Sequence, residues 1–274
     1  MVATLITHDF LRTRGLLFGA AGIALALGAF LFGTSWLLGG VLGQLTWVLG
    51  MVLAFGFLPL AQLWLAVDLY ISSFSKRGYF VQTLPMSGSA ILTAKYLWGL
   101  LVTVFAGVVS LILGTFTAAT AAQFMGAGLR EVWAALLEML RMMNLSPSIW
   151  TLVIGLFVLY LVQSIITYYF CVTLGSEAWI NKLGGAGPIL VWVGFYVVMQ
   201  IVALISLLLP GTLVFTGTGF AWSWDSFFSP LFAGMEMDPD TAGFPVMTIL
   251  VIVLMLAVLV WRSYVSVSRK IDLR

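Results

Sequence analysis

Six long apolar runs are the feature that most restricts how this chain can fold. A helix needs about 20 apolar residues to cross the hydrocarbon core, whereas a membrane strand needs only about 10. Of the 274 residues, 62% are hydrophobic and 8% are charged, against about 25% charged in soluble domains. We therefore predict an all-α integral membrane protein with one transmembrane domain over residues 1–274, whose spans are 16–38, 45–71, 96–121, 149–174, 188–209 and 245–262.

The lysines and arginines indicate the orientation of these spans. If the N-terminus is cytosolic, alternation places only Arg130 and Arg141 outside, and the other ten of the twelve basic residues inside. Short cytosolic segments of membrane proteins are enriched in lysine and arginine. We therefore predict a multi-pass protein of the cytoplasmic (inner) membrane with both termini cytosolic. The inner set is Arg12, Arg14, Lys76, Arg77, Lys95, Lys182, Arg262, Arg269, Lys270 and Arg274.

The segment before the first span combines apolar residues with Thr4, His8 and Arg12 at a spacing of four, which places these three on one helix face. This pattern favours a short interfacial helix over residues 1–14. A frayed, positively charged terminus that only orients the first span explains the residues equally well. Four glycines inside the first span are irregularly spaced, and we interpret them as lipid-tolerant small residues: Gly19, Gly22, Gly28 and Gly33.

Two segments on the predicted outer side are more elaborate than simple loops. Residues 129–143 repeat apolar side chains with a period near 3.6, which predicts an amphipathic helix on the membrane surface. Residues 210–244 are aromatic but interrupted by glycine and proline. We expect a pair of short helices dipping into the outer leaflet, followed by an acidic turn; an aromatic belt around one ordinary loop is the alternative. The acidic turn holds Glu236, Asp238 and Asp240.

Several kinds of catalytic chemistry have no basis in this sequence. The GxxxxGK[ST] spacing that cradles phosphates does not occur, because the glycines near Lys182 follow that lysine. One histidine, His8, and one cysteine, Cys171, cannot supply a clustered metal site. We therefore expect a chain that is not an enzyme, with no catalytic residue, no metal site and no bound cofactor.

Polar residues inside spans cost free energy in lipid and often mark a transport pathway. The candidates are Gln62, Asp68, Gln163 and Gln200. The alternative for Asp68 is a pair with a nearby lysine or arginine, and hydrogen bonds between helices account equally well for the glutamines. A proton-driven antiporter would carry several buried carboxylates, so the single Asp68 argues against that class.

The connector between the second and third spans carries the most specific motif. It reads RGYFVQTLPMSGSAILTAK over residues 77–95. Pro85 ends any helix that precedes it, Ser87 or Ser89 can cap the third span, and Lys95 is expected to extend to the inner headgroups. The alternative is a tight cytosolic turn that only joins two spans.

This motif resembles the cytoplasmic connector of ABC transporter permeases of the type-2 exporter family, whose pattern is roughly G-[YF]-L-x-x-T-L-P-x-S-x-x-x-[IL]-[IL]-x-x-K. Phe80 or Val81 stands where the family often has leucine, and Gly88 replaces a more usual basic residue. The match covers about a tenth of the chain. The resemblance implies a coupling helix that seats in a groove of the ATP-binding subunit, carried by Lys76, Arg77, Gly78, Tyr79, Phe80, Thr83, Leu84 and Pro85.

The resemblance also implies the function and the partners. We expect a permease subunit of an ATP-driven exporter that pairs with a second permease, identical or homologous, and with two ATPase chains that bind ATP and Mg²⁺. Membrane lipid is a further expected partner and nucleic acid is not. The alternatives are a permease-like immunity or sensor subunit for peptide antibiotics and an energy-independent carrier.

Overall fold

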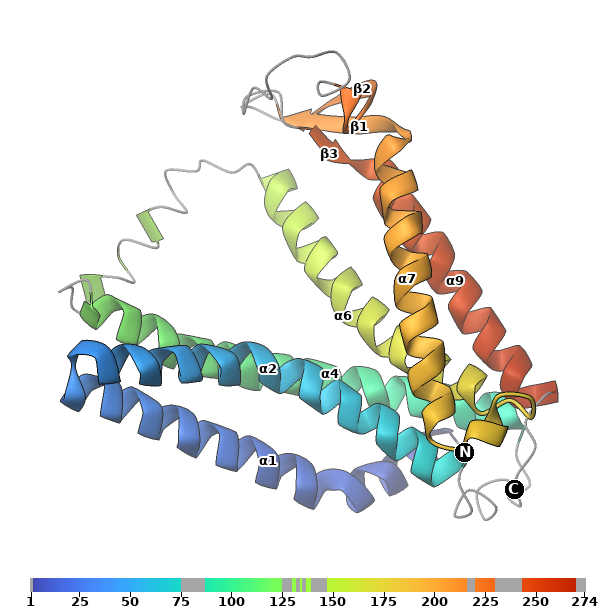
Figure 1. Cartoon of the computed structure of the whole chain (residues 1–274), viewed down its shortest axis with the longest axis horizontal. Helices are drawn as coiled ribbons and strands as arrows, with labels where there is room; N and C mark the ends of the chain where they lie inside the picture. Colours follow the sequence, from blue (N-terminus) through green and yellow to red (C-terminus); the bar gives the residue numbers. More distant parts are fainter. Residues whose placement is uncertain are drawn as a thin grey trace. The chain divides into compact units, whose positions relative to one another are not determined.

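The computed structural model describes residues 2–74, 87–124, 147–215, 220–229 and 243–269, together with positions 130–131, 134 and 137–138. Within this part, six helices are long and apolar enough to cross a membrane (Figure 1). They confirm the prediction of a helical, multi-pass membrane protein. The helices are α1 (Val2–Leu38), α2 (Gly40–Ser73), α4 (Gly88–Phe124), α6 (Pro147–Gly175), α7 (Ala186–Leu208) and α9 (Val246–Arg269).

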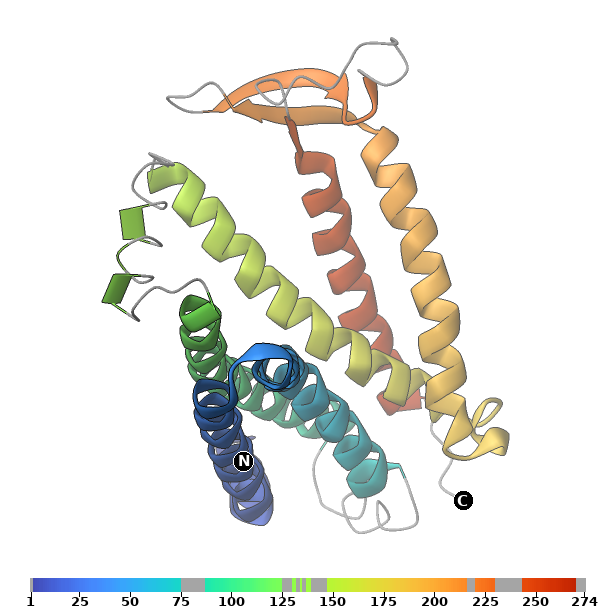
Figure 2. The ribbon, with the colours of Figure 1, turned by 60° about the vertical axis from the view of Figure 1, so that its left-hand side comes forward.

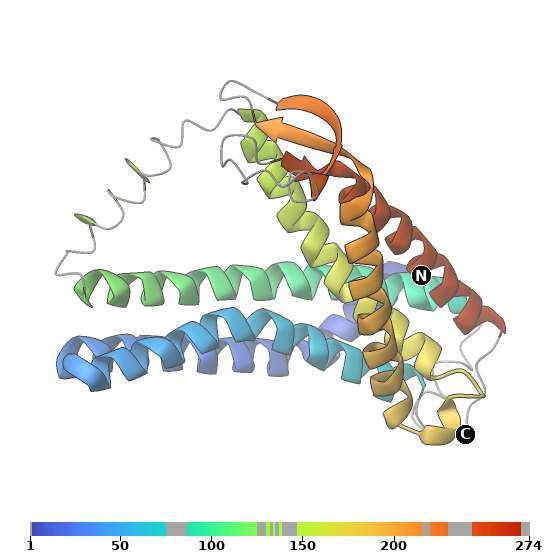
Figure 3. The same cartoon turned by 45° about the horizontal axis from the view of Figure 1, so that its top comes forward.

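The chain divides into two compact units, Met1–Asn144 and Leu145–Arg274. In the first unit, α1, α2 and α4 lie side by side (Figure 3). The reversal between α1 and α2 is much tighter than the expected loop, because Gly39 and Gly40 both have positive φ angles of 56° and 51°. Glycine adopts this conformation without the steric cost that other residues incur. The two helices therefore form a hairpin with almost no connecting loop.

The N-terminal segment is not a separate interfacial helix, contrary to the prediction. α1 continues without a break from Val2 to Leu38, a length of about 55 Å at 1.5 Å per residue. The hydrocarbon core is only about 30 Å thick, so a helix of this length extends beyond it. Gly15 stands between the polar start of α1 and its apolar body but does not interrupt the helix. Polar contacts described below hold this start against α2 and α4.

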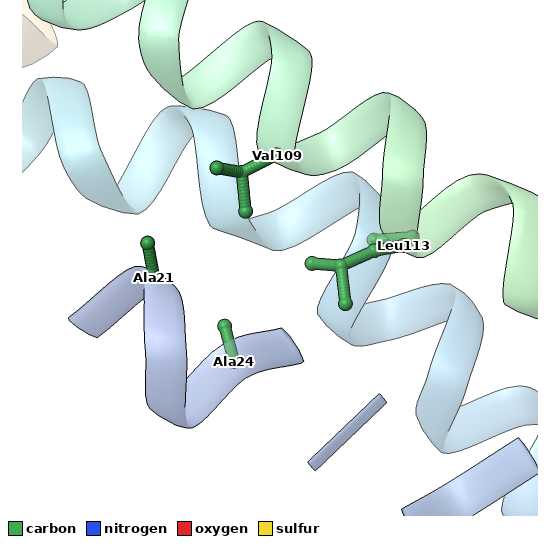
Figure 4. Close-up of a cluster of buried hydrophobic side chains, with 5 residues drawn as sticks. Ala21, Ala24, Val109 and Leu113 are labelled. Carbon is green, nitrogen blue, oxygen red and sulfur yellow. The ribbon is translucent and has the colours of Figure 1, made fainter. Parts of the chain in front are cut away.

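The core of the first unit is built from small residues opposite branched ones. Ala21 and Ala24 of α1 and Ala54 of α2 are buried together with Val109 and Leu113 of α4 (Figure 4). Small residues allow helices to approach closely, which is how helices associate in lipid. Close helix packing therefore holds the three helices of this unit together along their apolar length.

Gly28 of α1 belongs to this packed interface, whereas Gly19, Gly22 and Gly33 have open space around them. A Cβ atom on Gly28 would lie within van der Waals overlap of Leu113 and close to Phe116. The interpretation of these glycines as lipid-tolerant residues therefore fits three positions and is wrong for Gly28.

In the second unit, α6 and α7 meet at their connector and separate toward their other ends (Figures 1 and 2). The close approach depends on glycine: a Cβ atom on Gly175 would overlap the backbone of Pro188, and one on Gly187 would overlap the carbonyl oxygen of Gly175. A short 3-10 helix, η2 (Asn181–Leu183), lies within this connector. α9 packs against α6 and, less extensively, against α7.

The aromatic segment after α7 forms a sheet where short helices were predicted. β1 (Pro210–Phe215) pairs antiparallel with β2 (Phe220–Ser226) and with β3 (Gly243–Pro245), in the order β2-β1-β3. Leu213 of β1 lies between Trp222 and Phe244 in the register. The physical reason is the alternation of aromatic and small residues in β2, which suits a strand with two different faces. The sheet follows α7 and precedes α9 (Figure 2).

Two other predicted outer elements lie outside the described residues. The amphipathic helix over 129–143 is represented only by isolated positions, which are helical. The acidic turn with Glu236, Asp238 and Asp240 is not described at all. Both stay predictions.

Replacing Gly28 tests the close packing of α1 on α4. We expect Gly28→Val to lower the free energy of unfolding by about 1–3 kcal/mol, because overpacking a filled core forces side chains off their rotamers. Gly19→Val on the same helix is the matched control, since nothing lies within 4 Å of its added Cβ. Thermal unfolding of both variants in detergent measures the difference. Equal stability of the two would contradict the packing described here.

Candidate functional site

The predicted coupling residues 76–85 lie outside the described residues. The structure does describe the helix ends that flank them. Before them, Phe74 is buried and its N–H donates to the carbonyl oxygen of Tyr70 at 2.9 Å. After them, the hydroxyl of Ser87 accepts a hydrogen bond from the N–H of Ala90 at 3.3 Å. Ser87 therefore caps α4 as predicted.

A buried ion pair joins α4 to α1 near these helix ends. The ammonium of Lys95 donates to Asp9 Oδ1 at 2.9 Å and to the hydroxyl of Ser72 on α2 at 3.4 Å. Lys95 is only 7% exposed, so the expectation that it extends to the headgroups is wrong. The physical reason is the carboxylate of Asp9, which pairs with the ammonium of Lys95 inside the protein, so that the side chain does not need the headgroups as partners.

Arg12 continues this network to a second carboxylate. Its guanidinium lies 2.5 Å from Asp68 Oδ2 on α2 and 3.5 Å from Asp9 Oδ1 one turn earlier on α1. Lys95, Asp9, Arg12 and Asp68 thus form a chain of two cations and two anions. This geometry matches the alternative interpretation of Asp68 as a paired carboxylate. We call these four residues with Ser72 the unit 1 network.

Gln62, the second candidate in this unit, is almost fully enclosed between helices. It is 1% exposed, and its amide nitrogen lies 3.4 Å from the hydroxyl of Thr103 on α4. A polar side chain buried in this way is suited to linking two helices. A role for Gln62 in a substrate pathway stays a prediction.

The second unit carries its own buried carboxylate in the connector after α6. Glu177 is 1% exposed, and its Oε1 lies 2.6 Å from Arg262 Nη2 and accepts a hydrogen bond from Ser266 at 2.8 Å. Its Oε2 accepts the indole N–H of Trp179 at 2.8 Å. Burial alone would raise the pKa of Glu177, but these hydrogen bonds and the charge of Arg262 hold it below its usual value. Glu177 is therefore ionised at neutral pH and fastens α9 to the connector.

Gln163 and Gln200 come together in a groove of about 430 Å³ between α6 and α7. Neither amide has a hydrogen-bond partner within the described residues. Ser164 and Thr167 also line the groove, and the Ser164 hydroxyl donates to the carbonyl oxygen of Leu161 at 2.9 Å. The rest of the lining is aromatic apart from Met199. An unpaired amide at membrane depth favours a polar ligand, since lipid offers it no hydrogen bond.

The aromatic residues of the groove are not among the candidates predicted from the sequence, although their spacing along the two helices indicates a shared face. On α6 the lining residues stand at 160, 163, 164, 167 and 168, and on α7 at 192, 195, 196, 199 and 200. Both sets follow the i, i+3, i+4, i+7, i+8 spacing of one helix face. An aromatic and amide stripe on two successive spans is compatible with a shared groove. Asp9 carried a weaker signal, as an acid one turn before Arg12.

No protein-family model, curated protein or solved structure matches this chain.

Removing one partner of the Lys95–Asp9 pair should destabilise the first unit. We expect Asp9→Leu alone to cost about 3–5 kcal/mol, because it leaves the buried ammonium of Lys95 without a carboxylate, and the double variant to recover most of that loss. Lys95→Met alone should cost less, because Asp9 keeps Arg12 at 3.5 Å. A double-mutant cycle on thermal unfolding measures the coupling. Thr4→Ala, at an exposed position of the same helix, is the control. Additive losses in the cycle would contradict a direct ion pair.

The low pKa of Glu177 predicts a pH-dependent contribution to stability. A carboxylate whose pKa is lowered in the folded state stabilises that state above the unfolded pKa, near 4.3, and loses this contribution as pH falls. We expect Glu177→Gln to cost about 1.5–3 kcal/mol at pH 7. The difference from the unsubstituted protein should shrink below about pH 4.

Unfolding temperatures measured from pH 7 down to pH 3.5 test this expectation. Glu138→Gln, at an exposed described position, is the control. A gap between Glu177→Gln and the unsubstituted protein that is constant across this range would show that the charge of Glu177 is not what stabilises the connector.

Proposed function

We propose that this chain is the membrane-spanning permease subunit of an ATP-driven ABC exporter of the type-2 family. The motif over Gly78–Lys95 supports the assignment by resemblance. The structural observation that supports it most is the unit 1 network. It joins the C-terminal end of α2, the N-terminal part of α4 and the N-terminal part of α1 at one place. These are the helix ends next to residues 76–85.

This arrangement suits the transmission of force. A push on residues 76–85 acts directly on Ser73 at the end of α2 and on Ser87 at the start of α4. Because Lys95, Asp9 and Arg12 tie α1 to both helices, the three helices of the first unit would move together. Such rigid-body motion is a common form of conformational switching. In this proposal, closure of two ATPase subunits around ATP and Mg²⁺ supplies the push.

The remaining parts of the proposal follow from the expected topology. The chain lies in the cytoplasmic membrane with both termini cytosolic, which puts the unit 1 network and Glu177 on the cytosolic side. A second permease copy or a homologue completes the transporter. Gln163 and Gln200 in the α6–α7 groove are the favoured candidates for contact with the transported substrate.

Co-purification from the native host in mild detergent tests the ATPase partner. We expect a near-equimolar second chain that carries a P-loop. Phe80→Asp with Leu84→Asp should reduce its recovery at least about tenfold, because two charges in an apolar docking surface are costly to bury. Leu183→Asp, at an exposed apolar position in the other predicted cytosolic connector, is the matched control.

Two results would contradict the proposal. One is the absence of any P-loop partner in several mild detergents, which would favour the energy-independent carrier. The other is undiminished recovery of the partner with the Phe80 and Leu84 variant, which would remove the coupling assignment from residues 76–85.

A further inference from the structure

The α6–α7 groove is unusually rich in aromatic rings. Five of its ten lining residues are aromatic: Tyr160 and Tyr168 on α6, and Trp192, Phe195 and Tyr196 on α7. The rings of Trp192 and Tyr196 are stacked, with their centroids 6.0 Å apart. The face of an aromatic ring carries partial negative charge and attracts cations that lie within about 6 Å of its centroid. Several such faces around one groove form an environment that favours positive charge.

The lining carries no formal charge of either sign, so its preference for a ligand depends on the rings and the amides. Among the described residues, no lysine, arginine, aspartate or glutamate lines the groove. Neither an anion nor a cation finds a full counter-charge there, and the ring faces are the feature that favours a cation. The amide oxygens of Gln163 and Gln200 add two acceptors that no described residue occupies. A sugar or other hydroxyl-rich ligand would bring more polar groups than these two amides, Ser164 and Thr167 can pair, and unpaired groups are costly at this depth.

The position of the groove within the membrane restricts the kind of cation that can bind there. Its residues occupy the central turns of α6 (Pro147–Gly175) and α7 (Ala186–Leu208), which are both candidate spans. A compact ammonium ion loses most of its hydration there, at high cost. A cation whose charge is shielded by organic substituents loses much less, and its substituents contact the rings. A volume of about 430 Å³ lies within the usual range for small-molecule sites.

We infer that the α6–α7 groove is a binding site for bulky organic cations of the quaternary ammonium or phosphonium class. Tyr160, Tyr168, Trp192 and Tyr196 supply the ring faces, and Gln163 and Gln200 supply carbonyl oxygens at its edge. The site belongs to this chain alone. Its test can therefore fail while the proposed ATPase partner is found, and it can succeed while no such partner exists.

Two ions of matched size and opposite charge test the inference. The full chain in nanodiscs of zwitterionic lipid is dialysed to equilibrium against radiolabelled tetraphenylphosphonium and, in separate samples, against tetraphenylborate, with empty nanodiscs subtracted. We expect saturable binding of the phosphonium and none of the borate. Saturable binding of both ions would show a hydrophobic groove without preference for positive charge, and would overturn the inference. Binding of neither would also overturn it.

Substitutions at Tyr196 separate ring electrostatics from apolar contact. Tyr196→Phe keeps the ring face and should bind the phosphonium nearly as well as the unsubstituted protein. Tyr196→Leu keeps an apolar side chain without the ring and should bind about fivefold to thirtyfold more weakly. Trp192→Leu should weaken binding to a similar extent.

The control is Trp224→Leu in the second unit, since Trp224 is 72% exposed on β2 and does not line the groove. Equal affinity of Tyr196→Phe and Tyr196→Leu, in protein whose thermal unfolding is unchanged, would contradict a site that depends on ring faces. A loss of affinity in Trp224→Leu equal to that in Trp192→Leu would place the binding elsewhere.

Discussion

The buried pair between Lys95 and Asp9 is the interaction on which the first unit depends. Over most of their length, α1, α2 and α4 contact one another through small and apolar side chains, which fit closely but offer little that fixes one helix against sliding along another. An ion pair inside the protein has one good geometry and a high cost if it is broken. Together with Ser72 and Asp68, this ion pair fixes the position of α1, α2 and α4 along one another at one end of the unit.

The second unit uses the same principle with different residues. Glu177 lies in the connector after α6 and engages Arg262 and Ser266 of α9, while Gly175 and Gly187 let the connector pass close to the start of α7. Each unit thus has its described buried ion pairs at one end of the helices. Elsewhere the packing is mainly apolar, with isolated polar contacts such as Gln62 with Thr103. The α6–α7 groove departs from this plan, because it places unpaired amides at the centre of two spans. A departure of this kind is expected at a binding site.

The sequence predicts the elements of this protein better than their contacts. The thickness of the bilayer sets the length of a spanning helix at about 20 apolar residues, so the number of spans can be predicted from the apolar runs in the sequence. The partner of Lys95 is not readable in this way, because Asp9 is 86 positions away and no local pattern links them. The strand β2 is predictable from its sequence, since Phe220, Trp222 and Trp224 alternate with smaller residues. The glycines and prolines nearby are equally compatible with broken helices, which is why the segment as a whole does not identify a sheet. The groove residues share a helical period on both spans, but nothing in their types predicts that the aromatic residues of the two spans face one groove.

The balance of charge in the unit 1 network has an electrical consequence. Lys95 and Arg12 carry two positive charges, and Asp9 and Asp68 carry two negative ones. Moving an uncompensated charge through the full membrane potential requires about 2.3 kcal/mol per 100 mV, but a neutral cluster that moves as one body requires almost none. The unit 1 network can therefore change position with almost no work of its own against the membrane voltage.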